Sequence, residues 1–277
     1  MMESIPSPFE RPSSPGTMCL ILDGSFDADL LARLFQGDEQ SRPRCIPLFL
    51  NTPYAELQPA GPYVVVCPAK GESTAYASAL LEQSDAGCVA WLSNEQDLDN
   101  GVEHWRSLLT VRTDDAPQQM MRFFDPRWLE PLLRSLNETE RNQFIGPFTA
   151  MAWRNEMGWR YYARAAQSLA AALQPPAWLY LSPEREESIE QGRLKVIAAR
   201  FAEDYREVLP AQDTVEFVHR QLLAGQQAGY QQMADQERWL RLAISRGDSF
   251  WATAPDAELL ARNDVALGEK LTQLESL

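Results

Sequence analysis

The sequence lacks the short motifs that mark the common catalytic and phosphate-binding sites. Its 277 residues contain no G-x-S-x-G, G-x-x-x-x-G-K-[ST], G-x-G-x-x-G or H-E-x-x-H pattern. Nucleophile elbows, phosphate cradles and zinc-protease helices depend on that local geometry, so these enzyme classes are disfavoured. We therefore expect a binding protein with no catalytic site of its own.

Metal ligands are also scarce. The only two histidines, His104 and His219, lie far apart, and each fits a packing or helix-surface role better than a ligand or general-base role. The four cysteines contain no C-x-x-C pair and stand beside apolar residues: Cys19, Cys45, Cys67 and Cys88. They predict free, buried thiols in a reducing compartment, and the sequence indicates neither a metal nor another cofactor.

Basic residues are outnumbered. Lys and Arg total 25 against 39 Asp and Glu, which gives a formal charge of −14. The resulting field repels phosphate backbones and anionic lipids, so nucleic acid and membrane are not expected partners. No apolar run approaches the roughly 20 residues that span a bilayer, and the opening MMESIPSPFERPSSPGT has no signal-peptide pattern. These features predict a cytoplasmic protein.

The pattern of apolar residues predicts three parts. Residues 1–17 are rich in Pro and Ser and predict a flexible tail. Residues 18–180 alternate short apolar runs with amphipathic stretches, which predicts an α/β or α+β lobe with a mixed sheet. Residues 181–277 predict an all-α lobe. The expected strands lie at 18–25, 45–50, 61–68, 87–93, around 110–120 and in a hairpin over 148–164; Pro47 suits only an edge or a strand start.

Helices are expected where apolar residues recur with helical spacing. The predicted helices of the first lobe cover about 72–84 and 97–109, with another beginning at Asp125-Pro126, where Asp caps the helix and Pro occupies its first position. In the second lobe, Ser182-Pro183-Glu184 predicts a start, and one apolar stripe follows: Leu194, Ile197, Phe201, Tyr205 and Val208. Further helices are expected at about 213–225, 231–246 and 256–274.

Two places could carry a ligand site. Asp23-Gly24-Ser25 follows a strand, where ligands of α/β sheets gather; the alternative is a tight turn at Gly24 whose backbone Asp23 or Ser25 satisfies. A hydrolase that uses Asp23 with a second carboxylate is the competing functional hypothesis, and a structural subunit of a larger assembly is a third. Arg122 and Arg127 bracket Asp125 and could bind an anion, although local ion pairs that fix the turn are favoured.

Aromatic residues late in the chain suggest a docking surface. Trp91, Trp105, Trp128 and Trp153 lie in patterned segments and predict core positions. Trp239, Phe250 and Trp251 instead flank the turn ISRGDS, where exposed aromatic side chains could anchor a partner.

Four segments of the first lobe form a recognisable set: LILDG, PLFLNTPYAELQPAGPYVVV, the Trp-Leu-Ser strand at 91–93 and MMRFFDPRWLEPLL. The most specific block among them is Arg122-Phe123-Phe124-Asp125-Pro126-Arg127. Together they resemble the defining domain of bacterial type VI secretion effector chaperones, also called adaptors. The helical segments LSPEREESIEQGR, GYQQMADQERWLRLAISRGDSFW and EKLTQL are similar to the usual continuation of that family. The resemblance implies a non-enzymatic protein that binds a toxic effector and loads it onto the secretion spike protein. Asp23, Gly24 and the residues of the RFFDPR block would then be structural family positions.

Overall fold

The computed structural model of the chain describes residues 2–10, 16–36, 42–68, 70–83, 85–155, 157–164, 173–209 and 213–276. The chain divides into two compact units, Met1–Glu190 and Gln191–Leu277. The sequence predicted this division at residue 180. The structure places it within helix α6 (Pro183–Asp204), because Ile189 packs in the core of the first unit and Leu194 in that of the second.

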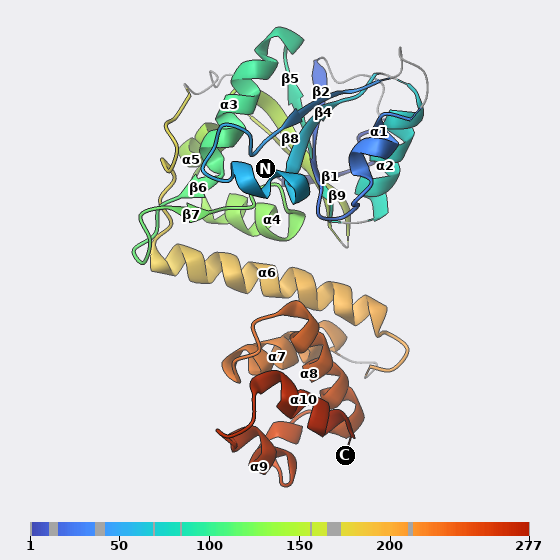
Figure 1. Cartoon of the computed structure of the whole chain (residues 1–277), viewed down its shortest axis with the longest axis vertical. Coiled ribbons are helices and arrows are strands. Elements are labelled where there is room, and N and C mark those ends of the chain that lie inside the picture. The colour runs from blue at the N-terminus through green and yellow to red at the C-terminus, as the bar shows by residue number, and fades with distance from the viewer. Residues whose placement is uncertain are drawn as a thin grey trace. The chain divides into compact units, whose positions relative to one another are not determined.

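The first unit is built on a sheet that, in the described residues, has seven strands in the order β1-β9-β8-β5-β2-β4-β3 (Figure 1). The strands are β1 (Met2–Ile5), β2 (Thr17–Asp23), β3 (Arg44–Pro47), β4 (Pro62–Val66), β5 (Gly87–Leu92), β8 (Phe148–Asn155) and β9 (Gly158–Ala163). Every described pairing between these strands is antiparallel. The predicted fold class is confirmed, in its α+β form, with an antiparallel sheet where a mixed one was expected.

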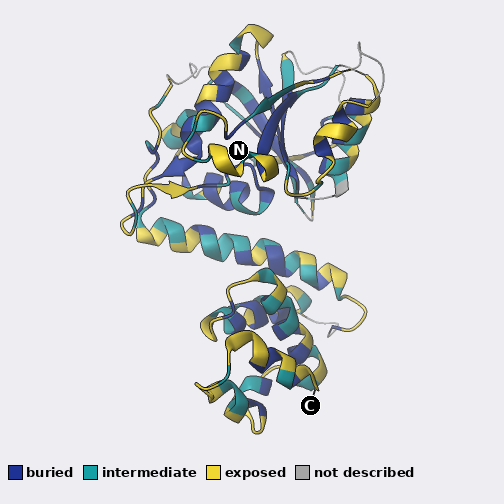
Figure 2. Ribbon diagram, viewed as in Figure 1, coloured by how far each residue is buried: buried dark blue, intermediate teal, exposed yellow. Residues whose placement is uncertain are grey.

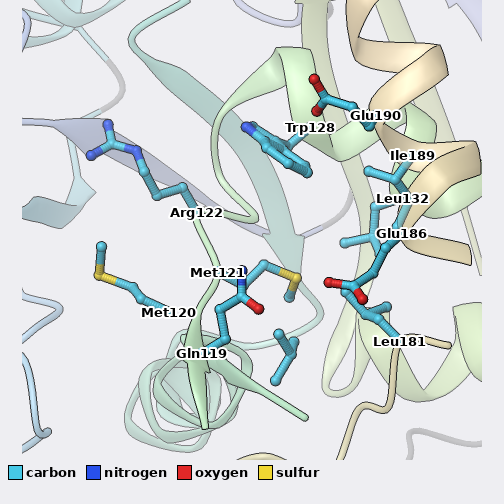
Figure 3. Close-up of a pocket in the computed structure, with 11 residues that line it drawn as sticks. Gln119, Met120, Met121, Arg122, Trp128, Leu132, Leu181, Glu186, Ile189 and Glu190 are labelled. Atoms are coloured by element: carbon cyan, nitrogen blue, oxygen red, sulfur yellow. The ribbon is translucent and has the colours of Figure 1, made fainter. Parts of the chain in front are cut away.

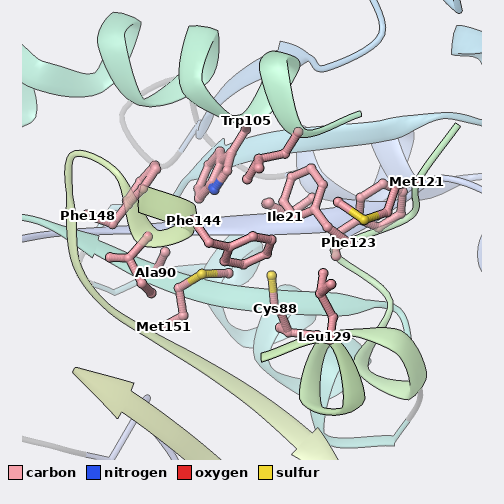
Figure 4. Close-up of a cluster of buried hydrophobic side chains, with 14 of the residues drawn as sticks. Ile21, Cys88, Ala90, Trp105, Met121, Phe123, Leu129, Phe144, Phe148 and Met151 are labelled. Carbon is pink, nitrogen blue, oxygen red and sulfur yellow. The ribbon is translucent and has the colours of Figure 1, made fainter. Parts of the chain in front are cut away.

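Helices cover both faces of the central strands. Along β2, Cys19 and Ile21 face one core, whereas Leu20 and Leu22 face another, because successive side chains of a strand point to opposite sides. Helices α3 (Leu98–Leu108), α4 (Pro126–Ser135) and α5 (Glu138–Ile145) pack on the first face, and α1 (Leu30–Leu34) and α2 (Glu72–Gln83) on the second (Figure 1). The first core includes Trp105 stacked on Phe148 at 4.0 Å between ring centroids (Figure 4).

The two edges of the sheet test two predictions. Pro47 lies at the end of edge strand β3, as its missing N–H requires. At the other edge, the expectation of a flexible tail over residues 1–17 is wrong for β1, which pairs with β9. There Ile5 is buried, and Phe9 packs edge-on against Trp159 at 6.1 Å. Residues 11–15 of the predicted tail lie outside the described residues.

Short elements complete the first unit. The strands β6 (Thr110–Val111) and β7 (Gln119–Met120) pair as a small hairpin, as the sequence predicted. Among the described residues of this unit, the 3-10 helices are η2 (Ala55–Ala60) and η3 (Glu95–Asp97).

The second unit is helical, as predicted. It contains the C-terminal part of α6, then α7 (Thr214–Gln227), α8 (Met233–Arg246), η4 (Phe250–Ala252), α9 (Asp256–Ala261) and α10 (Leu267–Ser276). The single helix expected over 256–274 is in fact two, separated by a turn in which Arg262 pairs with Asp264 at 2.6 Å. Val208 leaves the predicted apolar stripe and is exposed, because α6 ends at Asp204.

Burial follows these elements: the central strands and the inner sides of the helices are buried, whereas loops and outer helix faces are exposed (Figure 2). None of the described helices has the length and apolar character that a bilayer span requires.

Candidate protein-docking site

Asp23 ends strand β2 with both carboxylate oxygens engaged. The backbone N–H and the hydroxyl of Ser25 donate to Oδ1 at 3.0 and 2.8 Å, and Nη2 of Arg122 donates to Oδ2. The carboxylate is buried, so the guanidinium compensates a charge that water does not reach. A Cβ on Gly24 would lie 2.7 Å from the carbonyl oxygen of Gly61, so the turn requires glycine.

Asp125 caps helix α4, as the sequence predicted. Its Oδ1 accepts a hydrogen bond from the backbone N–H of Arg127 at 3.0 Å, and Pro126 occupies the first turn. The Arg127 side chain folds back onto the same carboxylate, with Nε 2.9 Å from Oδ1 and Nη2 2.6 Å from Oδ2. This hydrogen bonding to Asp125 raises the pKa of Arg127.

The RFFDPR block therefore fixes a turn rather than offering two free cations. Arg127 forms the local ion pair that was favoured over an anion site. Arg122 differs from that expectation, because its partner is Asp23, 99 residues away in sequence. Phe123 and Phe124 are fully buried, and the Arg122 guanidinium lies 5.4 Å from the Phe124 ring centre. The block thus ties the start of α4 to the end of β2.

An apolar groove of about 340 Å³ lies directly beside this block (Figure 3). The groove is lined by Val111, Gln119, Met120, Met121, Arg122, Trp128, Leu132, Leu181, Glu186, Ile189 and Glu190. Its buried floor belongs to the main core of the first unit, whereas Met120 is 36% exposed and Trp128 half-buried. The groove combines the β6–β7 hairpin, α4 and the first turns of α6.

The charges around the groove are unevenly distributed. Arg122 and Met120 lie on one side, and Glu186 and Glu190 on the other (Figure 3). Burial, with the neighbouring carboxylates of Asp115 and Asp114, raises the pKa of Glu186. Because Arg122 pairs with Asp23, it does not offset the charge of Glu186 across the groove.

The aromatic cluster of the second unit is not an exposed surface. Trp239 and Phe250 are 1% and 2% exposed, and their rings pack together at 4.9 Å between centroids. They were expected to anchor a partner, but they are core residues of this small unit, where they pack with other buried side chains such as Tyr230 and Leu222. Trp251 is half-buried, 5.5 Å from Trp239, and keeps one accessible side.

His104 and the cysteines have structural environments. His104 is buried with Nε2 2.7 Å from the carbonyl oxygen of Phe144, and burial lowers its pKa. The cysteines are free, and burial raises the pKa of Cys19 to about 12. Within the part of the chain that the structure describes, no three His, Cys, Asp or Glu side chains gather as a metal site would need.

The sequence patterns indicated Asp23 and the RFFDPR block as site residues, but they did not indicate the groove. Met120, Met121 and Glu186 were assigned no role, and Trp128 was placed in the core. The available signal was indirect: a methionine pair in a short hairpin, next to a tryptophan at the start of a helix.

The fold and this site define a two-unit protein whose first unit carries a half-open apolar groove. Residues 19–143 match the family model described as "Domain of unknown function (DUF4123)". The matched segment contains Asp23, Gly24 and the whole RFFDPR block and ends before α6. The comparisons with curated proteins and with solved structures found no match.

Proposed function

We propose that this chain is a non-enzymatic adaptor that binds a toxic effector of the type VI secretion system in the cytoplasm and loads it onto the secretion spike protein. The observation that carries the proposal is the match of residues 19–143 to a family associated with effector adaptors of that system. The same segment contains the residues on which the sequence resemblance rests.

The geometry of the matched segment supports a binding role. Arg122, Asp125 and Arg127 hold the backbone at the point where the groove begins, so these residues shape a surface. A half-open apolar groove is the kind of feature by which one protein holds another. Nucleic acid and membrane are excluded from the proposed partners because of the net charge of −14.

The competing hydrolase hypothesis is less well supported. A general base needs an oxygen that can accept a substrate proton, whereas Arg122 and Ser25 already donate to both oxygens of Asp23.

Deletion of the gene in the native host tests the proposal. We expect one effector to disappear from the secreted fraction while secretion of the tube protein continues, and a plasmid copy of the gene to restore the effector. The tagged adaptor should bind that effector and the spike protein when each is purified. Normal secretion of every effector in the deletion strain would contradict the proposal.

A further inference from the structure

The groove exposes part of an apolar surface that is continuous with the core of the first unit. Its floor of Met121, Leu132 and Ile189 is continuous with the main core of the first unit, but Met120 and Trp128 leave its mouth accessible. A volume of about 340 Å³ can hold a few apolar side chains. Methionines such as Met120 and Met121 adapt their shape to different ligands.

The shape of the surrounding elements favours a helix over an added strand. Strand addition needs a free sheet edge of several residues, but β6 and β7 each have only two. The backbone directly after β6 is also occupied, because the Arg112 N–H donates to the Leu179 carbonyl at 2.9 Å and the Leu181 N–H to that of Arg112 at 2.9 Å. A helix needs no backbone partner and uses only the apolar floor.

The carboxylates around the groove indicate which charged side chains would flank the apolar face of such a helix. Glu186 and Glu190 lie along one wall, and Asp114 and Asp115 in the hairpin turn add to the field at Glu186. The nearest lining cation, Arg122, is engaged by Asp23. An incoming Lys or Arg would reduce this like-charge repulsion, whereas an incoming carboxylate would increase it.

We propose that the groove binds an amphipathic helix of a client protein, with its apolar face on Met121 and Ile189 and basic side chains toward Glu186. This inference rests on the proposed adaptor function for its biological meaning, but the binding chemistry belongs to the groove alone.

A pair of synthetic peptides tests the groove in the full-length protein. Each is about 18 residues long, because shorter isolated helices are marginal. Both carry one leucine face, flanked by lysines in one peptide and by glutamates in the other, and fluorescence anisotropy measures their affinities. We expect the lysine peptide to bind at least about tenfold more tightly than the glutamate peptide, with the preference shrinking as salt is added.

Matched variants locate the binding. Met120→Arg blocks and charges the mouth of the groove, and we expect it to weaken the lysine peptide about tenfold. Met157→Arg makes the same change at a residue that is 82% exposed and outside the groove, and should change the affinity less than about twofold. Glu186→Lys should weaken binding about as much as Met120→Arg, whereas its exposed neighbour Glu187→Lys should not.

Three outcomes would overturn the inference: equal affinity for both peptides, equal effects of Met120→Arg and Met157→Arg, or a dimer by light scattering that Met120→Arg converts to a monomer. The last would make a second copy of this chain the occupant. Failure of the proposed adaptor function can be distinguished from failure of this inference. In the first case, deletion of the gene for this protein would leave effector secretion unchanged, although the lysine peptide would still bind to the groove.

Discussion

The aromatic cluster of the helical unit and the groove of the sheet unit are both built from large apolar side chains. In the cluster most of these side chains are buried, whereas in the groove some of them stay accessible. Trp239, Phe250 and Trp251 lie close together in sequence, and two of the three are core residues. The groove is assembled from segments spread between Val111 and Glu190, and it stays open. Aromatic side chains that are neighbours in a small helical unit are needed inside it, whereas a binding surface can be shared among distant segments.

Truncation of the cluster should have the largest effect on stability. Trp239→Ala removes a fully buried indole, and we expect it to lower the free energy of unfolding by about 3–5 kcal/mol. Urea unfolding of the full-length protein followed by circular dichroism measures the loss. The half-buried Trp251→Ala should cost clearly less. Similar losses at both positions would mean that the cluster is not organised around Trp239.

Removal of the link between β2 and the RFFDPR block should have the next largest effect. Arg122→Met leaves the buried Asp23 carboxylate without its cation; because the Arg122 side chain is 35% exposed, we expect a loss of about 2–3 kcal/mol. Asp23→Asn in the same chain should recover part of it in a double-mutant cycle. The control, Arg206→Met, removes a mostly exposed pair with Glu203 and should leave the unfolding midpoint unchanged. If Arg122→Met and Arg206→Met lowered the free energy of unfolding equally, the Arg122–Asp23 pair would contribute no more than an exposed ion pair does.

Loss of the cap on α4 should cost less. Asp125→Ala removes the hydrogen bond to the Arg127 backbone together with its side-chain pair, for an expected loss of about 1–2 kcal/mol in thermal or urea unfolding. If unfolding is unchanged while effector binding is lost, Asp125 belongs to an interface.

The smallest effect per residue concerns the cysteines, all of which lie in the sheet unit. Burial raises the pKa of Cys19 and Cys45 to about 12, with nearby Cys67 contributing at Cys45. Because the folded pKa exceeds the unfolded value of about 8.5, the thiols stabilise the fold below pH 8.5 and lose that contribution as pH rises toward 12. We expect each of these thiols to cost the sheet unit on the order of 1 kcal/mol of its free energy of unfolding between pH 8 and about 9.5.

The rate of cysteine alkylation in urea, measured at several pH values, reports unfolding of the sheet unit alone, because no cysteine lies after residue 190. Stability independent of pH over this range would contradict the burial of these thiols.

Local signals were sufficient for most elements of the fold. Asp125-Pro126 marks a helix start by its own chemistry, and the segment around NEMG predicts the β8–β9 hairpin from turn residues between aromatic strands. Strand direction was not available in the same way. The strands β2 and β5 are apolar on both faces because helices cover both, and such runs resemble those of parallel strands.

Features that depend on distant partners could not be predicted. Met2–Ile5 becomes a strand only because β9 offers a free edge, which the Pro- and Ser-rich sequence does not indicate. The pairing of Arg122 with Asp23 and the placement of Met120 and Glu186 around one groove likewise depend on tertiary structure. The sequence located the structural half of the site, and only the fold reveals the groove beside it.

The affinity of the purified cognate effector for three full-length variants tests whether the groove of the sheet unit binds the effector. We expect Met120→Arg to weaken effector binding at least about tenfold, the control Met157→Arg not to weaken it, and Trp251→Ala to have less than about a twofold effect. Loss of binding in Trp251→Ala with unchanged melting, together with normal binding by Met120→Arg, would contradict binding at the groove and assign the client to the helical unit.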